Sequence, residues 1–336
     1  MTISLDSIPR FTAAEALAVA MKDYGLDGQM SPLPSERDQN FLITDPRGGK
    51  FVLKIANRSD APQLLDFQHQ AMRRVAASPA DCRVQSIVRT RAGADITSIE
   101  DAAAGMRHCV RVLTWIEGEV LAACTPRSAA LLESIGAGMA GIGAALSGFT
   151  HPAMRRVLQW DLRHAGLARE HAHLLPPARR PRVEHAFAGW EKIDWTPLRH
   201  GVIHGDANDY NVLVEQGRMT GLLDFGDMVY SAIVCDLAIA LAYTMLHEKE
   251  PLRAAALVIR AYHRHNALTE AEQRVLYPLI LARLAASVCI SAHNRLRNPD
   301  DAYQVVTEKA AWELLDLLEP CSADAAQELV REACGP

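Results

Sequence analysis

The stretch that decides the fold is Val202-Ile-His-Gly-Asp206-Ala-Asn-Asp-Tyr-Asn211-Val-Leu-Val, followed by Gly221-Leu-Leu-Asp224-Phe-Gly-Asp. Apolar triplets flank the polar loop between Asp206 and Asn211, so we expect a short buried strand on each side and a third strand that ends at Asp224. Asp and Asn often form ordinary turns, and either motif alone fits such a loop. Together, in this order and between strands, they indicate a functional site.

The part of the chain before this stretch has strand and hairpin patterns. Thr12-Ala-Ala-Glu15 predicts a capped helix that ends at Gly25. Short apolar runs on both sides of a turn at residues 45–49 predict a hairpin, in whose second strand Lys54 lies on the face opposite Phe51 and Leu53. A helix is expected over residues 62–77, and strands over residues 84–90 and 108–115.

Beyond about residue 115 the sequence is rich in alanine and helical in pattern. Helices are expected over residues 128–149, 161–175, 182–190, 234–246, 253–265, 269–291 and 300–318, and a strand-rich patch over residues 201–225. We therefore predict an α+β protein of two parts. These are a small strand-rich N-terminal part, residues 1–114, and a larger helical part, residues 115–336.

Composition excludes several classes of protein and of binding partner. The 336 residues are 49% apolar and 22% charged, as in ordinary globular proteins, and exceed the roughly 250 to 300 residues at which a single core stops growing. A net charge of -5 disfavours nucleic acid as the main partner, so we expect small molecules. Seven scattered cysteines without CxxC spacing disfavour a zinc ribbon or a disulfide framework. No signal-peptide pattern and no apolar run of about 18 residues are found, so we expect a cytoplasmic protein that does not contact membranes.

The two motifs have the order of a phosphoryl-transfer site. Protein kinases have a catalytic-loop Asp, an Asn five residues later and then an Asp-Phe-Gly triplet, which Asp206, Asn211 and Asp224 match. In that arrangement the first carboxylate lies near the incoming hydroxyl, and the amide oxygen and the second carboxylate bind Mg2+.

The sequence resembles the aminoglycoside phosphotransferase-like kinases and is most similar to their hydroxylysine kinase branch and to kinase domains fused to class III aminotransferases. The resemblance extends over about residues 12–320 and includes residues 35–41, 52–57 and 111–114 besides the two motifs. It implies a two-lobed, protein-kinase-like fold and transfer of the gamma-phosphate of ATP or GTP, with Mg2+, to a hydroxyl of a small amine-bearing metabolite such as hydroxylysine. Gly205 stands where protein kinases have Arg, and no Ala-Pro-Glu motif follows Gly226, so a protein substrate is disfavoured.

The family pattern also implies roles for single residues. Asp206 would orient or deprotonate the acceptor hydroxyl, while Asn211 and Asp224 would hold Mg2+. Nucleotide contacts are implied for Lys54, for its helix partner Asp66, for the loop residues Ser35, Arg37 and Asn40, and for the main chain of Val112, Leu113 and Thr114. Substrate contact is implied for Asp161 and Asp209, although Asp161 could instead cap a helix, and structural support for His204 and Asp236. Asp66 is shorter than the Glu usual in relatives and could instead be an exposed helix acid.

Several alternatives stay open at this point. The chain could be a pseudokinase that binds nucleotide or metabolite without chemistry, or a kinase for aminoglycosides, homoserine or choline-like acceptors. A metal-dependent phosphoesterase would need more ligands than the single histidine of the motif, His204. Gly136-x-Gly-x-x-Gly141 matches a dinucleotide motif in form, but it has no preceding strand and is better explained by close helix packing. The oligomeric state cannot be predicted.

Overall fold

The computed structural model describes residues 8–101, 105–297 and 306–335. These residues form two compact units. The first comprises the described residues of Met1–Arg73 and Val84–Glu117, and the second those of Arg74–Arg83 and Gly118–Pro336. Strands dominate the first unit and helices the second, which confirms the α+β class.

The short segment 74–83 belongs to the second unit although it precedes residue 114 in the sequence. A division of the chain at residue 114 alone does not include this segment in the second unit. Arg74 donates to the carbonyl oxygens of Ala145 and Ser147 over 2.6 and 2.8 Å. The main-chain N–H of Arg83 donates to the carbonyl oxygen of Thr220 over 2.8 Å. These hydrogen bonds attach the segment to elements that lie much later in the sequence.

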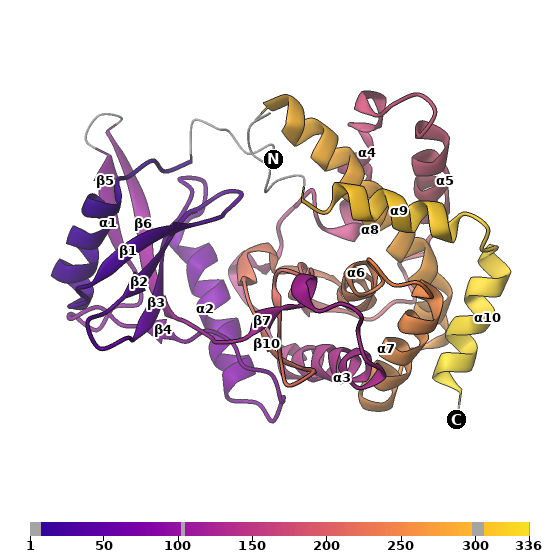
Figure 1. Cartoon of the computed structure of the whole chain (residues 1–336), viewed down its shortest axis with the longest axis horizontal. Coiled ribbons are helices and arrows are strands. Elements are labelled where there is room, and N and C mark those ends of the chain that lie inside the picture. Colours follow the sequence, from indigo (N-terminus) through magenta and orange to yellow (C-terminus); the bar gives the residue numbers. More distant parts are fainter. Residues whose placement is uncertain (1–7, 102–104, 298–305, 336) are drawn as a thin grey trace. The chain divides into compact units, whose positions relative to one another are not determined.

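An antiparallel sheet with two helices makes up the first unit. Its strands are β1 (Gln29–Leu33), β2 (Gln39–Thr44), β3 (Lys50–Ile55), β4 (Ile87–Val88), β5 (Thr97–Asp101) and β6 (Met106–Thr114). The order is β1-β2-β3-β6-β4, and β5 also pairs with β6. The helices α1 (Ala13–Val19) and α2 (Pro62–Ala76) cover opposite faces of this sheet (Figure 1).

The local patterns explain these elements. Thr12 and Glu15 form the expected capping box, and the helix continues as a π-helical turn to Tyr24 before Gly25 ends it with a φ of 72°. The hairpin forms as predicted: Leu53 packs in the core beneath α1, while Lys54 lies on the alternate face of β3.

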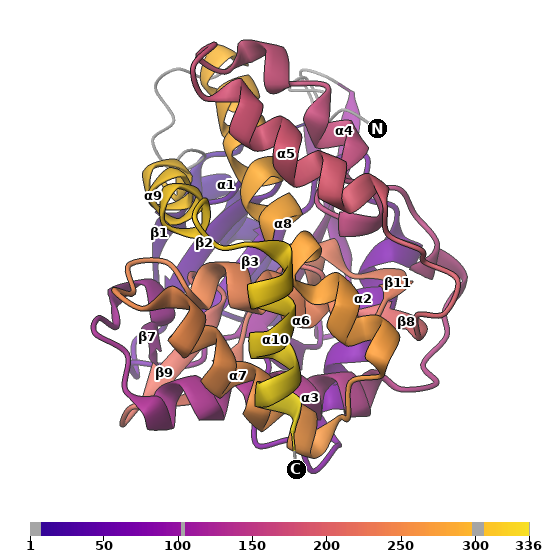
Figure 2. The same cartoon turned by 90° about the vertical axis from the view of Figure 1, so that its right-hand side faces the viewer.

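The second unit is mainly helical. Its helices are α3 (Ala129–Leu146), α4 (Gly166–Arg169), α5 (Arg180–Glu191), α6 (Val234–Thr244), α7 (Pro251–His265), α8 (Glu270–Arg297), α9 (Glu308–Leu318) and α10 (Ala323–Cys334). Figure 2 shows α10 beside α7 and α8. The strands β7 (Glu119–Val120), β9 (Val212–Glu215) and β10 (Arg218–Leu222) form one sheet, and β8 (His200–Ile203) and β11 (Val229–Ala232) form another. The polar loop therefore lies between β8 and β9, as the sequence predicted.

Two predicted helices differ from the structure or extend beyond its described residues. The continuous helix expected over residues 161–175 is wrong, because the segment forms the single turn α4 between two 3-10 turns. Its buried residues Leu162, Ala165, Ala168, Ala172 and Leu175 are three or four positions apart, which is the helical pattern itself, so periodicity alone does not reveal the interruption. The expected start of the last predicted helix at Asp300 lies outside the described residues, and α9 begins at Glu308.

The glycine motif within α3 serves close helix packing, as expected. A Cβ on Gly136 would lie within 3.0 Å of main-chain atoms of Val258 and Tyr262 in α7. Larger residues there would separate the two helices.

Length and hydropathy alone would allow α3 and α8 to cross a membrane, so the expectation that no stretch reaches this length is wrong. However, 50% of the apolar stretch of α3 and 78% of that of α8 are buried within the protein. Helix α8 also has Glu272 and Arg283 as buried charged residues. Buried core helices pass the same test, so this is weak evidence for a membrane protein.

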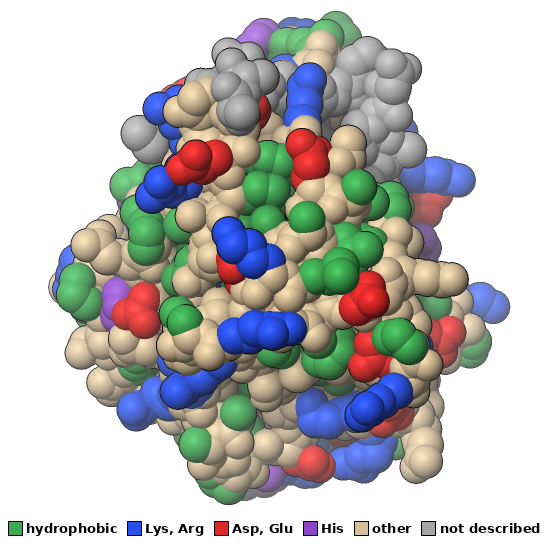
Figure 3. Space-filling model, turned by 90° about the vertical axis from the view of Figure 1, so that its left-hand side faces the viewer, with side chains coloured by type: hydrophobic (Ala, Val, Ile, Leu, Met, Phe, Trp, Pro, Cys, Tyr) green, Lys and Arg blue, Asp and Glu red, His purple; other side chains and the backbone are tan. Residues whose placement is uncertain are grey.

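One face of the molecule shows how surface charge is distributed (Figure 3). On this face the described Lys and Arg side chains are interspersed with Asp and Glu and do not form a continuous basic stripe.

Candidate active site

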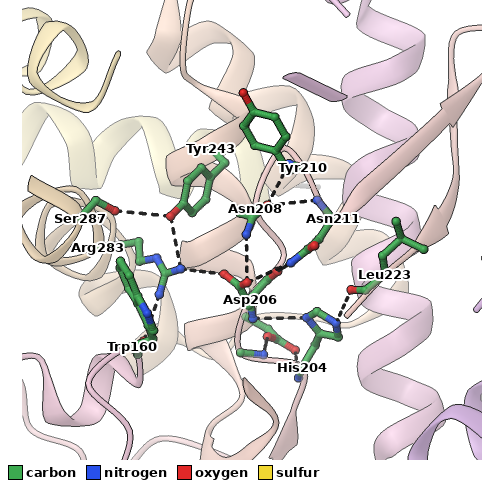
Figure 4. A network of polar contacts seen from close by, with 12 residues as sticks. Trp160, His204, Asp206, Asn208, Tyr210, Asn211, Leu223, Tyr243, Arg283 and Ser287 are labelled. Carbon is green, nitrogen blue, oxygen red and sulfur yellow. Dashed lines mark hydrogen bonds and ion pairs between the residues drawn. The ribbon is translucent and has the colours of Figure 1, made fainter. Parts of the chain in front are cut away.

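Asp206 lies in the loop between β8 and β9, and three side-chain donors hold its carboxylate (Figure 4). Its Oδ2 accepts hydrogen bonds from the Nδ2 atoms of Asn208 and Asn211, both at 2.9 Å. Its Oδ1 accepts one from Nη2 of Arg283 at 2.8 Å. Burial raises the pKa of Asp206 to about 6, while the charge of Arg283 acts in the opposite direction. The carboxylate is thus fixed in orientation but remains 20% exposed.

The amide of Asn211 is oriented by the same loop. Its Nδ2 donates to the main-chain oxygen of Asp206 and to the carboxylate, each at 2.9 Å. Because Nδ2 donates both of these hydrogen bonds, the amide oxygen of Asn211 remains available as an acceptor, and it points away from Asp206 (Figure 4). Asn208 supports this turn by accepting from the main-chain N–H groups of Tyr210 and Asn211 at 2.8 and 3.0 Å.

Asp224 lies next to Asn211 because the main-chain N–H of Leu223 donates to the carbonyl oxygen of Asn211 over 2.8 Å. Asp224 has a φ of 54°, an uncommon value for a residue other than glycine, and its Oδ1 accepts from the N–H of Gly226 at 3.0 Å. An amide oxygen and a carboxylate on adjacent backbones are hard oxygen ligands of the kind that Mg2+ prefers. The donor set therefore fits this metal.

His204 and Asp236 bind the backbone of the loop. Nε2 of His204 donates to the carbonyl oxygen of Leu223 at 3.0 Å, and Nδ1 accepts from the N–H of Asp206 at 3.3 Å. Burial lowers the pKa of His204, which favours the neutral ring that this pattern needs. Asp236, in α6, accepts from the N–H groups of His204 and Gly205 at 2.9 and 2.8 Å. Together the two side chains connect β8, the end of β10 and α6.

Gly205 is required by the backbone itself. Its φ is 83°, and a Cβ there would lie within 3.0 Å of the carbonyl oxygen of Asp227. In the sequence this glycine stands out only because protein kinases have an arginine there. The structure adds a steric reason, since the chain before Asp206 passes too close to Asp227 for any side chain.

Arg283 is the site residue that sequence reasoning missed. It lies on α8, and its side chain is 2% exposed. Besides Asp206, it donates to the carbonyl oxygen of Trp160 at 3.0 Å and to the hydroxyl of Tyr243 at 3.3 Å. A signal was present, because an arginine inside an apolar helix must find buried partners.

The two predicted substrate residues differ in their surroundings. Asp161 is buried and caps the turn that follows it: Oδ1 accepts from the N–H of Arg163 and from Ser231, at 3.1 and 2.7 Å. This agrees with the capping alternative, and its contact with substrate stays a prediction. Asp209 is 2% exposed, and its Oδ1 has no hydrogen-bond partner within the described part of the chain. Burial raises the pKa of Asp209 to about 6.

In the first unit Lys54 is 6% exposed, and its Nζ lies 3.9 Å from Oδ2 of Asp38. Asn40 and Arg111 are opposite Lys54 on the neighbouring strands. Asp66, in α2, accepts from Nε2 of Gln70 at 2.7 Å. The pair between Lys54 and Asp66 stays a prediction, and Asp38 is an acidic neighbour that the sequence analysis did not single out.

The remaining predicted nucleotide contacts lie at two places in the first unit. Ser35 and Arg37 are in the turn between β1 and β2, where the carbonyl oxygen of Arg37 accepts from Asn57 at 3.3 Å. Val112, Leu113 and Thr114 end β6. The N–H of Thr114 already donates to the carbonyl oxygen of Ser86 at 2.9 Å. Contacts of these residues with a nucleotide stay predictions.

A strand-rich unit with a buried lysine on β3, and a helical unit with the Asp–Asn loop and the Asp-Phe-Gly motif, define a class: phosphotransferases of protein-kinase-like fold. Comparison with known families agrees. The model of the Phosphotransferase enzyme family matches residues 29–276, and the chain belongs to this family.

Curated relatives include kinases of small hydroxylated amino acids. The chain is 29% identical to hydroxylysine kinase of Mus musculus, over 96% of this chain and 93% of the relative. It is also 29% identical to homoserine kinase of Nitrobacter winogradskyi, over 82% of each chain.

Solved structures share the fold. A microcompartment-associated aminopropanol kinase superposes with a TM-score of 0.72 at 15% identity and covers 95% of this chain and 100% of its own. An amicoumacin kinase in complex with AMP-PNP and Ca2+ has a TM-score of 0.69 at 17% identity and covers 91% and 94%. The protein is thus a small-molecule kinase that phosphorylates a hydroxyl group.

Proposed function

We propose that this kinase transfers the gamma-phosphate of ATP or GTP to the hydroxyl of hydroxylysine or a closely similar amino alcohol, with Asp206 as the catalytic base. The observation that supports this most directly is the Asp206 carboxylate, which is oriented by three donors and remains partly exposed. In phosphoryl transfer such a group orients the acceptor hydroxyl and accepts its proton as the new P–O bond forms and the bond from the γ-phosphorus to the departing nucleoside diphosphate breaks.

In this proposal Asn211 and Asp224 would hold Mg2+, which neutralises negative charge on the nucleotide phosphates when it is bound. The oriented amide oxygen of Asn211 and the adjacent carboxylate of Asp224 support this. Lys54 would contact the phosphates: it is buried on β3, its Nζ lies 3.9 Å from Oδ2 of Asp38, and it matches the strand lysine of the family.

The choice of acceptor follows from the relatives. The matches to relatives named hydroxylysine kinase cover 92–96% of this chain, and the match to homoserine kinase of Nitrobacter winogradskyi covers 82%. Both names describe amino acids with a side-chain hydroxyl, so homoserine is the second candidate.

A nucleotide-consumption screen with Mg2+ tests the acceptor. Hydroxylysine, homoserine, aminopropanol, choline and an aminoglycoside would each be offered with ATP and with GTP, and phosphate on the acceptor would be detected by mass spectrometry. We expect the highest kcat/KM with hydroxylysine. Turnover of homoserine alone would replace the acceptor, and no transfer to any acceptor would support the pseudokinase instead.

Asp206→Asn tests the base. The change keeps the shape of the side chain but removes the carboxylate that accepts the proton, so we expect kcat to fall about 10^2- to 10^4-fold. Nucleotide affinity, measured by calorimetry, should change little. Asp324→Asn, at an exposed position in the first turn of α10, is the matched control. An Asp206→Asn enzyme as active as this control would exclude Asp206 as the base.

A further inference from the structure

We propose that Arg283 is a positioning residue that leaves Oδ1 of Asp206 as the oxygen that receives the acceptor hydroxyl. The inference rests on the proposed role of Asp206 as the base. It goes further by naming the reactive oxygen and the residue that selects it.

The hydrogen bonds of Asp206 distinguish its two oxygens. A carboxylate oxygen has two lone-pair positions. Oδ2 already accepts from two amides, those of Asn208 and Asn211, which use both positions. Oδ1 accepts only from Arg283 in the described structure, so one position remains for a further donor. An incoming hydroxyl can therefore bind Oδ1 without breaking a bond of the loop.

Arg283 is itself held in one orientation. Its Nη1 donates to the carbonyl oxygen of Trp160 at 3.0 Å, and its Nη2 is shared between Asp206 and the hydroxyl of Tyr243. The guanidinium carbon lies 4.5 Å from the ring centre of Trp160 and 5.4 Å from that of Tyr243 (Figure 4). A planar cation against two aromatic rings gains cation–π energy and loses rotational freedom. The hydroxyl oxygen of Tyr243 lies 3.4 Å from Oγ of Ser287, which is one turn beyond Arg283 on α8.

A lysine at position 283 could not make the same contacts. A guanidinium donates through two different nitrogens to Asp206 and Trp160 while it stays within 4.5 Å of a ring centre, whereas an ammonium is a point charge. Without Arg283 the carboxylate would be held through Oδ2 alone, so the direction of Oδ1 would no longer be fixed. The loss should fall on turnover rather than on nucleotide binding.

The chain offers a control in which a second arginine, 38% exposed, bonds a buried carboxylate. Arg199 donates to both oxygens of Glu272 at 2.8 and 2.7 Å, and Glu272, like Arg283, lies on α8 and is buried. Arg199 is not bonded to Asp206. Arg199→Lys therefore reports what the weakening of such a pair does to stability alone.

The test compares Arg283→Met, Arg283→Lys and Arg199→Lys by kcat, nucleotide KM and thermal unfolding, with the best acceptor of the wild-type enzyme. We expect Arg283→Met to lower kcat about 10^2-fold, as a misplacement of about 1 Å can do, with nucleotide KM within about twofold. Arg283→Lys should be intermediate, and Arg199→Lys should lose stability while it keeps its kcat. Tyr243→Phe keeps the ring, removes one hydrogen bond and should cost only a few-fold in kcat.

Two results would overturn the proposal. One is a kcat of Arg283→Met within about threefold of that of Arg199→Lys, and the other is a nucleotide KM that rises as much as kcat falls. If Arg283→Met does not fold, Arg283→Lys is judged by the same criteria. Nucleotide hydrolysis without acceptor gives a second readout, because water then takes the place of the hydroxyl. Failure of the wild type with every acceptor would count against the proposed function, whereas equal variants would count against Arg283.

Discussion

Gly205→Ala tests whether the position of Asp206 depends on the close approach of the loop to Asp227. Gly205 has a φ of 83°, and a new Cβ would lie within 3.0 Å of the carbonyl oxygen of Asp227. Gly217, in the turn between β9 and β10, has a φ of 70° but nothing within 4 Å of its Cβ position. The pair of variants therefore separates the cost of the backbone conformation from the cost of the clash.

The expected losses in free energy of unfolding follow from the backbone conformation and the space at each glycine. A left-handed φ costs an alanine about 1 to 2 kcal/mol, which is all that Gly217→Ala should lose in free energy of unfolding. Gly205→Ala adds an overlap with main-chain atoms, for which overpacking costs of about 1 to 3 kcal/mol are typical. Relief of the overlap must move the backbone beside Asp206, so kcat should fall at least about tenfold, since a displacement of about 1 Å can cost 10^2-fold.

Urea denaturation and steady-state kinetics check both quantities. We expect Gly217→Ala to keep the kcat of the wild type and Gly205→Ala to lose both stability and turnover. Equal stability and equal kcat of the two variants would refute the reasoning, because the clash would then have no consequence.

Two further predictions concern buried groups. Asp236→Asn removes one of the two charge-assisted hydrogen bonds from the N–H groups of His204 and Gly205. The free energy of unfolding should therefore fall by about 2 to 3 kcal/mol, and kcat should fall with it. A kcat equal to that of the exposed control Asp324→Asn would show that catalysis does not depend on these two hydrogen bonds. Burial, followed by the charge of Arg111, lowers the pKa of His69 from 6.5 to about 3, so its neutral form stabilises the fold above pH 6.5 and that stability is lost as the pH falls towards 3. In acid denaturation, His69→Gln should lack a slope of about 1.4 kcal/mol per pH unit in this window, and identical pH profiles of variant and wild type would contradict a buried neutral His69.

Much of the site was predictable because its decisive contacts are local. Asn211 bonds to Asp206 only five residues away, within a loop whose flanking apolar triplets already predict strands. The same holds for the capping box at Thr12 and for the alternation that places Lys54 opposite Leu53. In each case the short stretch of sequence contains both partners of the interaction.

The failures have a common origin in longer-range or finer packing. After Asp161 the buried apolar residues keep a helical spacing although the backbone forms only short turns, so the sequence pattern could not show the interruption. The membrane-length helices α3 and α8 are explained by what packs against them, which their own composition cannot show. The segment 74–83 joins the second unit through bonds to Ala145 and Thr220, far along the chain.

By itself, the sequence determined the class of the fold, the family and the order of Asp206, Asn211 and Asp224, because strand periodicity and loop chemistry act over a few residues. Only the tertiary structure decided which oxygen of Asp206 has a free position and that Arg283, 77 residues away, occupies the other. A buried guanidinium can pair with any carboxylate that the fold brings to it, and no local pattern specifies which one. The need for glycine at position 205 has the same cause, since it is set by the carbonyl oxygen of Asp227 on a different turn.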